Sequence, residues 1–575
     1  MDTQRLILFV VFSFSALLLW EAWQKETRPP PPAAATQQAK PAPLGDLPSV
    51  PATPAAASAA ASPAPPGTVL PPGPSGQAGS PAAEPGRTIT ITTDLYRAEV
   101  DTQGGAITQV ALLKHRDPDS EAKPYLALLK TADRTHVAQS GLLGEGMPNH
   151  RSVYEALPGP RDLAAGADRV ELRLQMTAPN GDKVVQVLGF HRGNYVIDVE
   201  YDITNNGAAP VAPYAYFQLT RDTKTQGTHN SMAPVSYAGP VIYNETDKFK
   251  KIEFGELDKL AADPSRKLPY TKNADNGWAA MVEHYFVTAW LPSSEKKTAR
   301  EFYARKLDGG LYSVGMIVPV GTIAPGATAD VKVPLYVGPQ EQDELAKLAK
   351  GLDLVVDYGI FTVIAAPLFW LLKWLHGIVH NWGWAIVLLT IIIKSAFYPL
   401  NHASARSMAK MKVIAPKLKS LQEQYANDKQ QLQIKMMEMY KQEKINPLGG
   451  CLPIVVQIPV FIALYWVLLS AVELRNAPWI GWIKDLSAPD PYFVLPVIYA
   501  ITAYLQVKLS PTPISDPMQA KIMQIMPIAF SVMFIFFPSG LVLYWLINNS
   551  LQIFQQWHMN RVLEKEAALA AAKRR

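Results

Sequence analysis

The chain has 575 residues, a formal net charge of +5 and a single cysteine, Cys451. This length allows two or more domains, and one cysteine excludes an internal disulfide framework. Soluble and strongly apolar stretches alternate along the chain, which excludes one uniform globular class. Because the net charge is modest, the positions of the basic residues are more informative than their number.

The N-terminal residues predict a membrane anchor and a tether. An apolar stretch from Leu6 to Trp23 is about long enough to span a bilayer, and no small-x-small cleavage signal follows it. We therefore predict an uncleaved transmembrane anchor over residues 1–28. Residues 29–87 contain 17 prolines between Pro29 and Gly86 and almost no aromatic residues. Such a segment cannot bury enough apolar surface to fold, so it predicts a disordered linker.

Residues 88–340 show the period-two alternation of half-buried strands. The dipeptide Asn180-Gly181 lies between two such runs and predicts a hairpin turn. Short strands at this spacing predict one soluble, all-β sandwich domain. The clearest strand runs are 88–92, 169–176, 196–204 and 331–337.

The C-terminal half predicts a bundle of membrane helices. Residues 341–381 contain a polar helical piece and then an amphipathic helix from Phe361 to His376, which we expect to lie in the membrane interface. Five further spans form a core of residues 382–560, and together with the N-terminal anchor they make six transmembrane helices. The fold class is therefore a multi-domain protein, an all-α membrane bundle joined to an all-β sandwich. The five core spans are expected at Trp382–Leu400, Leu452–Val472, Tyr492–Leu509, Ile522–Phe537 and Leu541–Trp557.

The loop of residues 401–450 carries nine Lys and Arg residues against four acids, and the tail of residues 561–575 ends in KRR. The positive-inside rule places both in the cytoplasm, with both chain termini inside and the sandwich outside. Apolar residues at helical spacing predict a hairpin of two amphipathic helices. Its basic face could meet RNA or acidic partners, or it could be a solvated structural face. The candidate contact residues are Arg406, Lys410, Lys412, Lys417 and Lys419.

Lys394 lies inside the apolar run WGWAIVLLTIIIKSAFYPL. A charge at membrane depth costs a few kcal/mol, so it usually faces water or a partner. The alternative is a lysine that extends its ammonium group toward the interface.

Polar residues on the neighbouring spans favour a hydrated groove around Lys394. Thr390 is one turn earlier on the same helix face, and Gln457 interrupts the next span. The last span carries Asn548 and Gln552 four residues apart, although such residues also hydrogen-bond neighbouring helices as a packing device. The candidate groove residues are Lys394, Thr390, Gln457, Trp545, Tyr544, Asn548 and Gln552.

No enzyme motif accompanies these features. His376 and His380 are spaced as metal ligands can be, yet no HExxH glutamate is present. Glu283-His284 is predicted to begin a strand and has no nucleophile motif nearby. The sequence contains no P-loop and no GxSxG motif, so we predict neither catalysis, a metal nor a cofactor.

Several motifs resemble the YidC/Oxa1/Alb3 family of membrane protein insertases. The segments NPLGGC at 446–451 and FPSGLVLYWLINN at 537–549 are similar to the membrane core of that family. The segment GWAAMVEHYFVTAWLP at 277–292 is similar to the periplasmic domain of its Gram-negative members. The resemblance implies insertion and folding of inner-membrane proteins in the bacterial inner membrane, alone or beside the Sec translocon, with no cofactor.

The same resemblance implies roles for individual residues and partners. Lys394 matches a basic residue of the family's groove that is generally arginine. The positive charge is therefore kept, but the planar guanidinium group that can bind a carboxylate through two hydrogen bonds is absent. Thr390 matches a groove hydroxyl, and Trp545 stands where a relative has a substrate-contacting tyrosine. The implied partners are nascent inner-membrane proteins, the Sec translocon and membrane lipids, with the ribosome and targeting factors as further candidates and no specific DNA binding.

Two other function classes stay open. A transporter could use the same cavity for a small anion, although we see no internal repeat of the kind that transporters often show. A periplasmic assembly or carbohydrate-binding module could use the helices as an anchor only. Deletion of residues 88–338 would separate this last class from an insertase, since an insertase should keep much of its activity.

Overall fold

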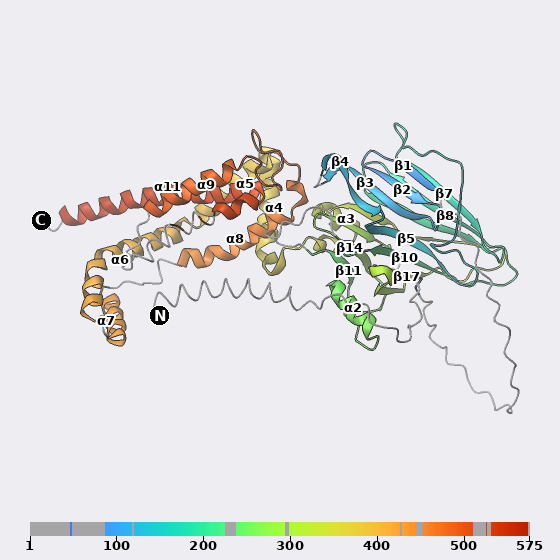
Figure 1. Ribbon diagram of the computed structural model, residues 1–575, viewed down its shortest axis with the longest axis horizontal. Helices are drawn as coiled ribbons and strands as arrows, with labels where there is room; N and C mark the ends of the chain where they lie inside the picture. The colour runs from blue at the N-terminus through green and yellow to red at the C-terminus, as the bar shows by residue number, and fades with distance from the viewer. Residues whose placement is uncertain are drawn as a thin grey trace, which may run out of the picture. The chain divides into compact units, whose positions relative to one another are not determined.

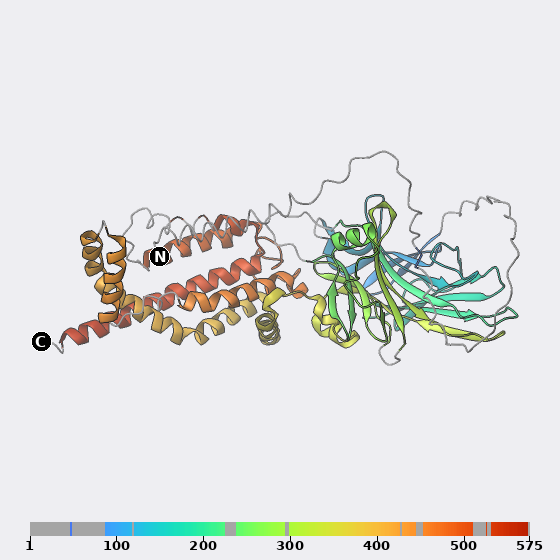
Figure 2. The ribbon, with the colours of Figure 1, turned by 90° about the horizontal axis from the view of Figure 1, so that it is seen from below.

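A computed structural model describes residues 47–48, 87–117, 120–224, 237–293, 298–425, 428–443, 452–509, 525, 529 and 531–572. The predicted N-terminal anchor and nearly all of the linker lie outside the described residues, as does most of the span predicted from Ile522 to Phe537. Two parts follow along the rest of the chain, a β-sandwich and a helical region (Figures 1 and 2).

The sandwich consists of two antiparallel sheets that pack face to face (Figure 1). The order in one sheet is β1-β2-β3-β4-β5-β10-β17-β16-β13, and in the other β12-β11-β14-β15-β19-β9-β8-β7-β6, with β18 paired to β9. The strands are β1 Thr88–Thr92, β2 Tyr96–Asp101, β3 Ala106–Asp117, β4 Ser120–Lys130, β5 Thr135–Leu143, β6 Glu155–Ala156, β7 Arg169–Thr177, β8 Lys183–His191, β9 Val196–Thr204, β10 Tyr214–Arg221, β11 Gly239–Asn244, β12 Lys248–Lys251, β13 Asn273–Ala274, β14 Trp278–Val282, β15 Phe286–Trp290, β16 Arg300–Lys306, β17 Tyr312–Pro319, β18 Thr328–Lys332 and β19 Leu335–Pro339.

Alternation along the strands produces the sandwich core. In β7, Val170, Leu172 and Leu174 are buried while the residues between them are not fully buried. Side chains of successive strand residues point to opposite faces, so one face of each strand fills the space between the sheets. The largest buried side chains of this core include Trp290 and Phe217, whose ring centroids lie 5.1 Å apart.

Most of the predicted strands are confirmed, with two corrections. The β7–β8 hairpin turns at Asn180-Gly181, where Gly181 has φ +90°. The run 331–337 is two strands, β18 and β19, because Pro334 between them has no N–H for a ladder bond. The prediction that Glu283-His284 begins a strand is wrong, since both residues lie in the turn between β14 and β15.

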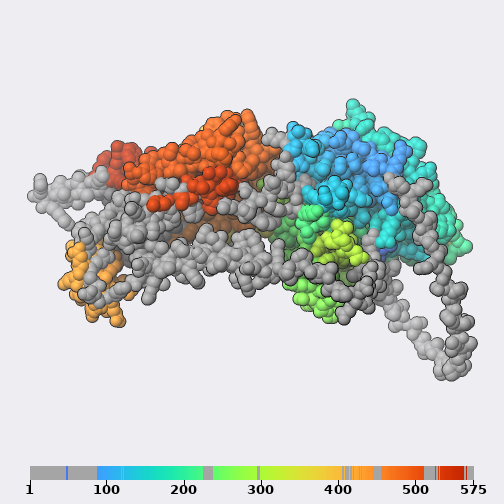
Figure 3. Space-filling model, in the orientation of Figure 1, coloured from blue at the N-terminus to red at the C-terminus, as the bar shows by residue number. Residues whose placement is uncertain are grey.

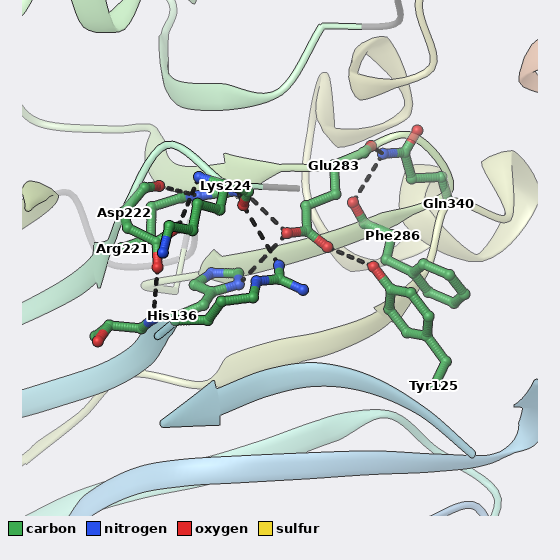
Figure 4. A network of polar contacts seen from close by, with 10 residues as sticks. Tyr125, His136, Arg221, Asp222, Lys224, Glu283, Phe286 and Gln340 are labelled. Atoms are coloured by element: carbon green, nitrogen blue, oxygen red, sulfur yellow. Dashed lines mark hydrogen bonds and ion pairs between the residues drawn. The ribbon is translucent and has the colours of Figure 1, made fainter. Parts of the chain in front are cut away.

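A buried polar network joins strands of the two sheets (Figure 4). Glu283 lies 3.1 Å from an Arg221 guanidinium nitrogen and 3.8 Å from His136 Nδ1, and it accepts a hydrogen bond of 2.5 Å from the Tyr125 hydroxyl. The Arg221 side chain is 1% exposed. Burial and the Arg221 charge hold the pKa of His136 well below its usual range, so this histidine is neutral. Nearby, the Gln340 side-chain amide donates to the backbone carbonyls of Glu283 and Phe286.

The helices of the described residues follow α2 Phe254–Ala262, which belongs to the sandwich. They are α3 Gln342–Leu348, α4 Thr362–Val379, α5 Trp382–Ala396, α6 Tyr398–Gln424, α7 Lys429–Gln442, α8 Leu452–Ser470, α9 Val494–Leu509 and α11 Ser539–Ala572. Short 3₁₀ turns are η1 Asp308–Gly310, η2 Leu352–Val355, η3 Gly359–Phe361, η5 Val472–Leu474 and η6 Phe534–Phe536.

The structure corrects two predicted spans. The span from Trp382 to Leu400 is broken at Phe397, where α5 ends and α6 begins with a bend of 53°. Pro399 stands in the first turn of α6, a position that a proline tolerates because its missing N–H has no helical partner there. The last span extends as α11 through most of the tail, far beyond Trp557.

By length and composition, one described helix, α4, could cross a membrane on its own. The bent pair of α5 and the start of α6 passes the same test together, whereas the apolar helices 455–470 and 494–509 are shorter. Figure 1 shows α4 running across the direction of α5, α8 and α9. One face of α4 packs through Phe369 and Leu372, while Trp370 and Trp374 on the other are 67% and 55% exposed. This amphipathic pattern fits the predicted interfacial helix, which stays a prediction.

The predicted hairpin in the 401–450 loop consists of α6 and α7. Ile414 of α6 and Met439 of α7 are buried against each other, with Leu418, Leu421 and Tyr440 packed around them. In the space-filling view, the yellow-orange atoms of α7 stand at one end of the helical region (Figure 3). Apolar contacts between the two helices therefore hold the hairpin together.

Candidate functional site

Lys394 is the centre of the candidate site. It lies in the last turn of α5, where the residue is 4% exposed. Its Nζ donates a hydrogen bond of 2.9 Å to Oε1 of Gln552 on α11. Among the residues that the structure describes, no carboxylate forms an ion pair with it. The ammonium group thus bonds a neutral amide on a neighbouring helix. A lysine that simply extends toward the membrane interface would not need this partner.

Helix α11 connects the polar groups of the bundle. Over two turns it carries four amide side chains, and each one hydrogen-bonds a different helix. These bonds satisfy polar groups that would otherwise be costly among apolar helices. The pairs are Gln457 Nε2 to Asn548 Oδ1 at 3.0 Å, Asn549 Nδ2 to Thr502 Oγ1 at 2.9 Å, Lys394 Nζ to Gln552 Oε1 at 2.9 Å, and Asn401 Nδ2 to Gln555 Oε1 at 3.3 Å.

Thr390 is buried near Lys394 on α5, but its hydroxyl is already used. Its Oγ1 donates 2.7 Å to the carbonyl of Ile386, one turn earlier in the same helix. This back-bonding satisfies the donor locally. Thr390 therefore contributes a small buried side chain, and in this conformation its hydroxyl proton does not point at Lys394.

Tyr544 and Trp545 form part of an aromatic wall one turn before the amides. The Trp545 ring lies 4.4 Å from Phe461 of α8, 6.3 Å from Tyr499 of α9 and 5.8 Å from Phe534, measured between ring centroids. Tyr544 is buried and stacks on Phe461 at 6.3 Å. We call the four hydrogen-bonded pairs of the α11 amides the polar layer. The aromatic rings lie between this layer and the end of the bundle where α11 begins.

The candidate contact residues of the hairpin are only partly described. The side chains of Arg406, Lys410, Lys412 and Lys419 lie outside the described residues. Lys417 is exposed, and its Nζ donates 2.7 Å to Glu443 just after α7. Such an exposed ion pair contributes at most about 1 kcal/mol, so Lys417 is available to other partners at little cost.

Three site residues were missed by the sequence analysis: Asn549, Thr502 and Asn401. Asn549 stands beside Asn548 in the run WLINNS, so the amide pair was a visible signal. Thr502 and Asn401 offered no such signal, because their importance depends on which helices pack against α11. Gln506, a polar residue of the same span as Thr502, forms no hydrogen bond that the structure describes.

Comparison with known proteins places these features in one class. The model of the YidC periplasmic domain matches residues 88–371, and that of the 60Kd inner membrane protein matches residues 374–566. The membrane protein insertase YidC of Aromatoleum aromaticum is 48% identical over 567 residues, covering 98% of this chain and 99% of the relative. That of Nitrosospira multiformis is 50% identical over 575 residues, covering 99% and 98%. A crystal structure of an active YidC insertase with its first transmembrane domain resolved covers 82% of this chain and 94% of its own, at 19% identity and a TM-score of 0.36.

A β-sandwich domain followed by a helical membrane region, matched by relatives over nearly the whole length, defines a membrane protein insertase with a periplasmic domain. The chain belongs to the YidC family. It is therefore an inner-membrane protein, and its relatives are named as insertases rather than enzymes.

Proposed function

We propose that this chain inserts nascent inner-membrane proteins through the polar layer around Lys394, which receives the acidic, hydrophilic tail of a substrate. The single observation that carries this proposal is the buried ammonium group of Lys394, whose hydrogen-bond partner among the described residues is the amide oxygen of Gln552. A carboxylate forms a stronger, charge-assisted hydrogen bond than an amide does. A substrate carboxylate can therefore replace Gln552 at the lysine.

The surrounding groups suit a transient polar path. The Gln457–Asn548 pair lies one turn away from Gln552 along α11 and offers further donors and acceptors to a polar tail. A fixed positive charge offsets part of the cost of removing the tail from water. The apolar segment of the substrate then partitions into lipid beside exposed apolar residues of α8 and α9, such as Val455 and Ile501.

The wider arrangement follows from the same proposal. The basic α6–α7 hairpin and the tail lie in the cytoplasm, where substrates arrive, and both termini are cytoplasmic. The protein then works alone or with the Sec translocon. Ribosomes and targeting factors are the partners that the hairpin would meet through its basic residues.

Complementation of a depletion strain tests the role of the charge. Lys394→Ala should impair insertion of substrates with acidic tails, and Lys394→Glu should impair it more, since the new carboxylate repels the tail. Lys508→Glu is the matched control, because it reverses a lysine in the last turn of α9 that is exposed. Full activity of Lys394→Glu would contradict the proposed role of the positive charge. A small-anion transporter, the other use of the same cavity, would instead show anion flux in liposomes that depends on Lys394.

A further inference from the structure

The segment between α8 and α9, residues 471–490, forms a cap over the ends of several membrane helices; we call it the cap. Asn381, the residue before α5, donates from Nδ2 to the backbone carbonyl of Trp479 at 3.1 Å. Gly540, in the first turn of α11, donates its N–H to the carbonyl of Leu486 at 2.8 Å. The cap thus ties together the N-terminal ends of α5 and α11, the two helices that carry Lys394 and Gln552.

Arg475 of the cap inserts its guanidinium group among three aromatic rings of the sandwich. Its Cζ lies 5.3 Å from the ring centre of Tyr125, 5.6 Å from Tyr285 and 5.2 Å from Phe286. We call these rings the cage. An Arg475 nitrogen also donates to the backbone carbonyl of Arg116. A cation within about 6 Å of a ring centre is attracted to its electron-rich face, and more strongly where water is excluded.

The buried polar network of the sandwich holds the rings of the cage in place (Figure 4). The rings of Tyr125 and Phe286 stack with centroids 3.9 Å apart, and the Tyr125 hydroxyl donates to Glu283. Glu283 is in turn paired with Arg221, and both side chains are at least nine-tenths buried. The position of the cage is therefore fixed by strands on both sheets, because Tyr125 comes from β4 and Phe286 from β15.

Two further contacts join the same turn of the sandwich to the membrane helices. His284 Nε2 lies 3.0 Å from the carbonyl oxygen of Leu469, one of the last carbonyls of α8, which lack partners within the helix. Burial lowers the pKa of His284, so its neutral ring donates this hydrogen bond. Ser487 of the cap also lies beside the hydroxyl of Tyr285.

We infer that the sandwich is a clamp on the cap, with Arg475 as the positioning residue that docks the cap into the cage. The clamp holds the external ends of α5 and α11 together while substrates use the polar layer between them. The sandwich thereby acquires a task that needs no ligand and no catalysis. The occupant of the cage is the chain's own Arg475, and the clamp does not depend on which substrates the polar layer accepts.

Hydrogen–deuterium exchange of the full chain tests this inference. In Arg475→Ala, the amide protons within the cap, such as that of Leu486, which bonds the carbonyl of Ala477, should exchange about fivefold to tenfold faster, as expected for the loss of a half-buried cation that contacts three rings. Lys484→Ala is the matched control, since Lys484 is an exposed residue of the same cap and its removal changes the net charge equally. Arg475→Lys keeps the charge and should restore part of the protection.

A change on the other side of the contact separates docking from a local effect of Arg475. Tyr285→Leu removes one cage ring and should also speed exchange in the cap, whereas Tyr285→Phe, which keeps the ring, should do so much less. The double variant Arg475→Ala with Tyr285→Leu should exchange no faster than Arg475→Ala alone. Unchanged exchange in Arg475→Ala, or effects of the two changes that simply multiply, would overturn the clamp. Neither result would bear on Lys394.

Discussion

The sandwich and the membrane bundle treat buried charge in opposite ways. In the sandwich, Glu283 has a cationic partner in Arg221 and a hydroxyl donor in Tyr125, so its charge is compensated within the fold. In the part of the bundle that the structure describes, the partner of Lys394 is the neutral oxygen of Gln552. A compensated pair stabilises one conformation as long as it is intact. A charge that bonds only a neutral amide can still gain free energy by binding a carboxylate of a substrate.

Breaking the compensated pair should have the largest effect. Glu283→Leu leaves the guanidinium of Arg221 buried without its carboxylate, which we expect to lower the free energy of unfolding of the sandwich by about 3–5 kcal/mol. Denaturant unfolding of the full chain in detergent measures it. Replacing both partners, Glu283→Leu with Arg221→Met, should recover part of the loss. If the double variant is less stable than Glu283→Leu alone, the charge compensation described here is incorrect.

Acid should weaken the sandwich through its buried histidines. Burial, followed by the charge of Arg305, lowers the pKa of His150 to about 4, against an ordinary value of about 6.5. The unfolded chain therefore takes up a proton below pH 6.5 while the folded chain does not, so stability is lost as the pH falls from 6.5 toward 4. At pH 5 the share of His150 is about 2 kcal/mol. Unfolding curves at pH 7.5 and pH 5 should show that His150→Asn reduces this difference; an unchanged pH dependence would contradict it.

A permanent partner for Lys394 should slow insertion. Gln552→Glu places a carboxylate where the amide oxygen now accepts from Lys394 Nζ, so a substrate tail would have to compete with an internal ion pair. Insertion of substrates with acidic tails should fall about tenfold, equivalent to about 1.4 kcal/mol. Gln552→Met, which keeps the length of the side chain but accepts only weakly, should not slow it. Equal insertion rates in the two variants would show that Gln552 does not occupy the position of the substrate.

Exchanging the cation should have the smallest effect. Lys394→Arg keeps the charge at the same depth and adds the planar fork that grips a carboxylate. Insertion rates in a depletion strain should therefore change by less than about twofold, since each 1.4 kcal/mol is tenfold and only hydrogen-bond geometry differs. A large loss would show that the site recognises the lysine itself rather than positive charge.

The sequence was a better guide to single elements than to contacts between them. Period-two alternation predicted β1, β7 and β9 because each strand has one face in the core. Lys394 was recognisable because an isolated charge in an apolar run is costly wherever the helix packs. Gln552 was among the candidate groove residues, but its direct bond to Lys394 was not predicted, since it joins residues 158 positions apart and depends on the rotation of two helices.

The contacts of Arg475 show the same limit. Nothing in the segment VELRNAPW distinguishes Arg475 from an ordinary loop arginine. Its importance arises from rings on β4 and β15, which are brought together only when the two sheets pack. The break at Phe397 had a sequence signal, because Pro399 is a residue type that favours the first turn of a helix.

The central claim is that Lys394 acts on substrates through its charge. The most direct measurement compares insertion into proteoliposomes of two substrates that differ only in whether the tail is acidic or neutral, using the unchanged protein and Lys394→Gln. We predict that Lys394→Gln slows the acidic substrate about tenfold, equivalent to about 1.4 kcal/mol, and leaves the neutral substrate unchanged. An equal loss for both substrates, or no loss for either, would contradict the account.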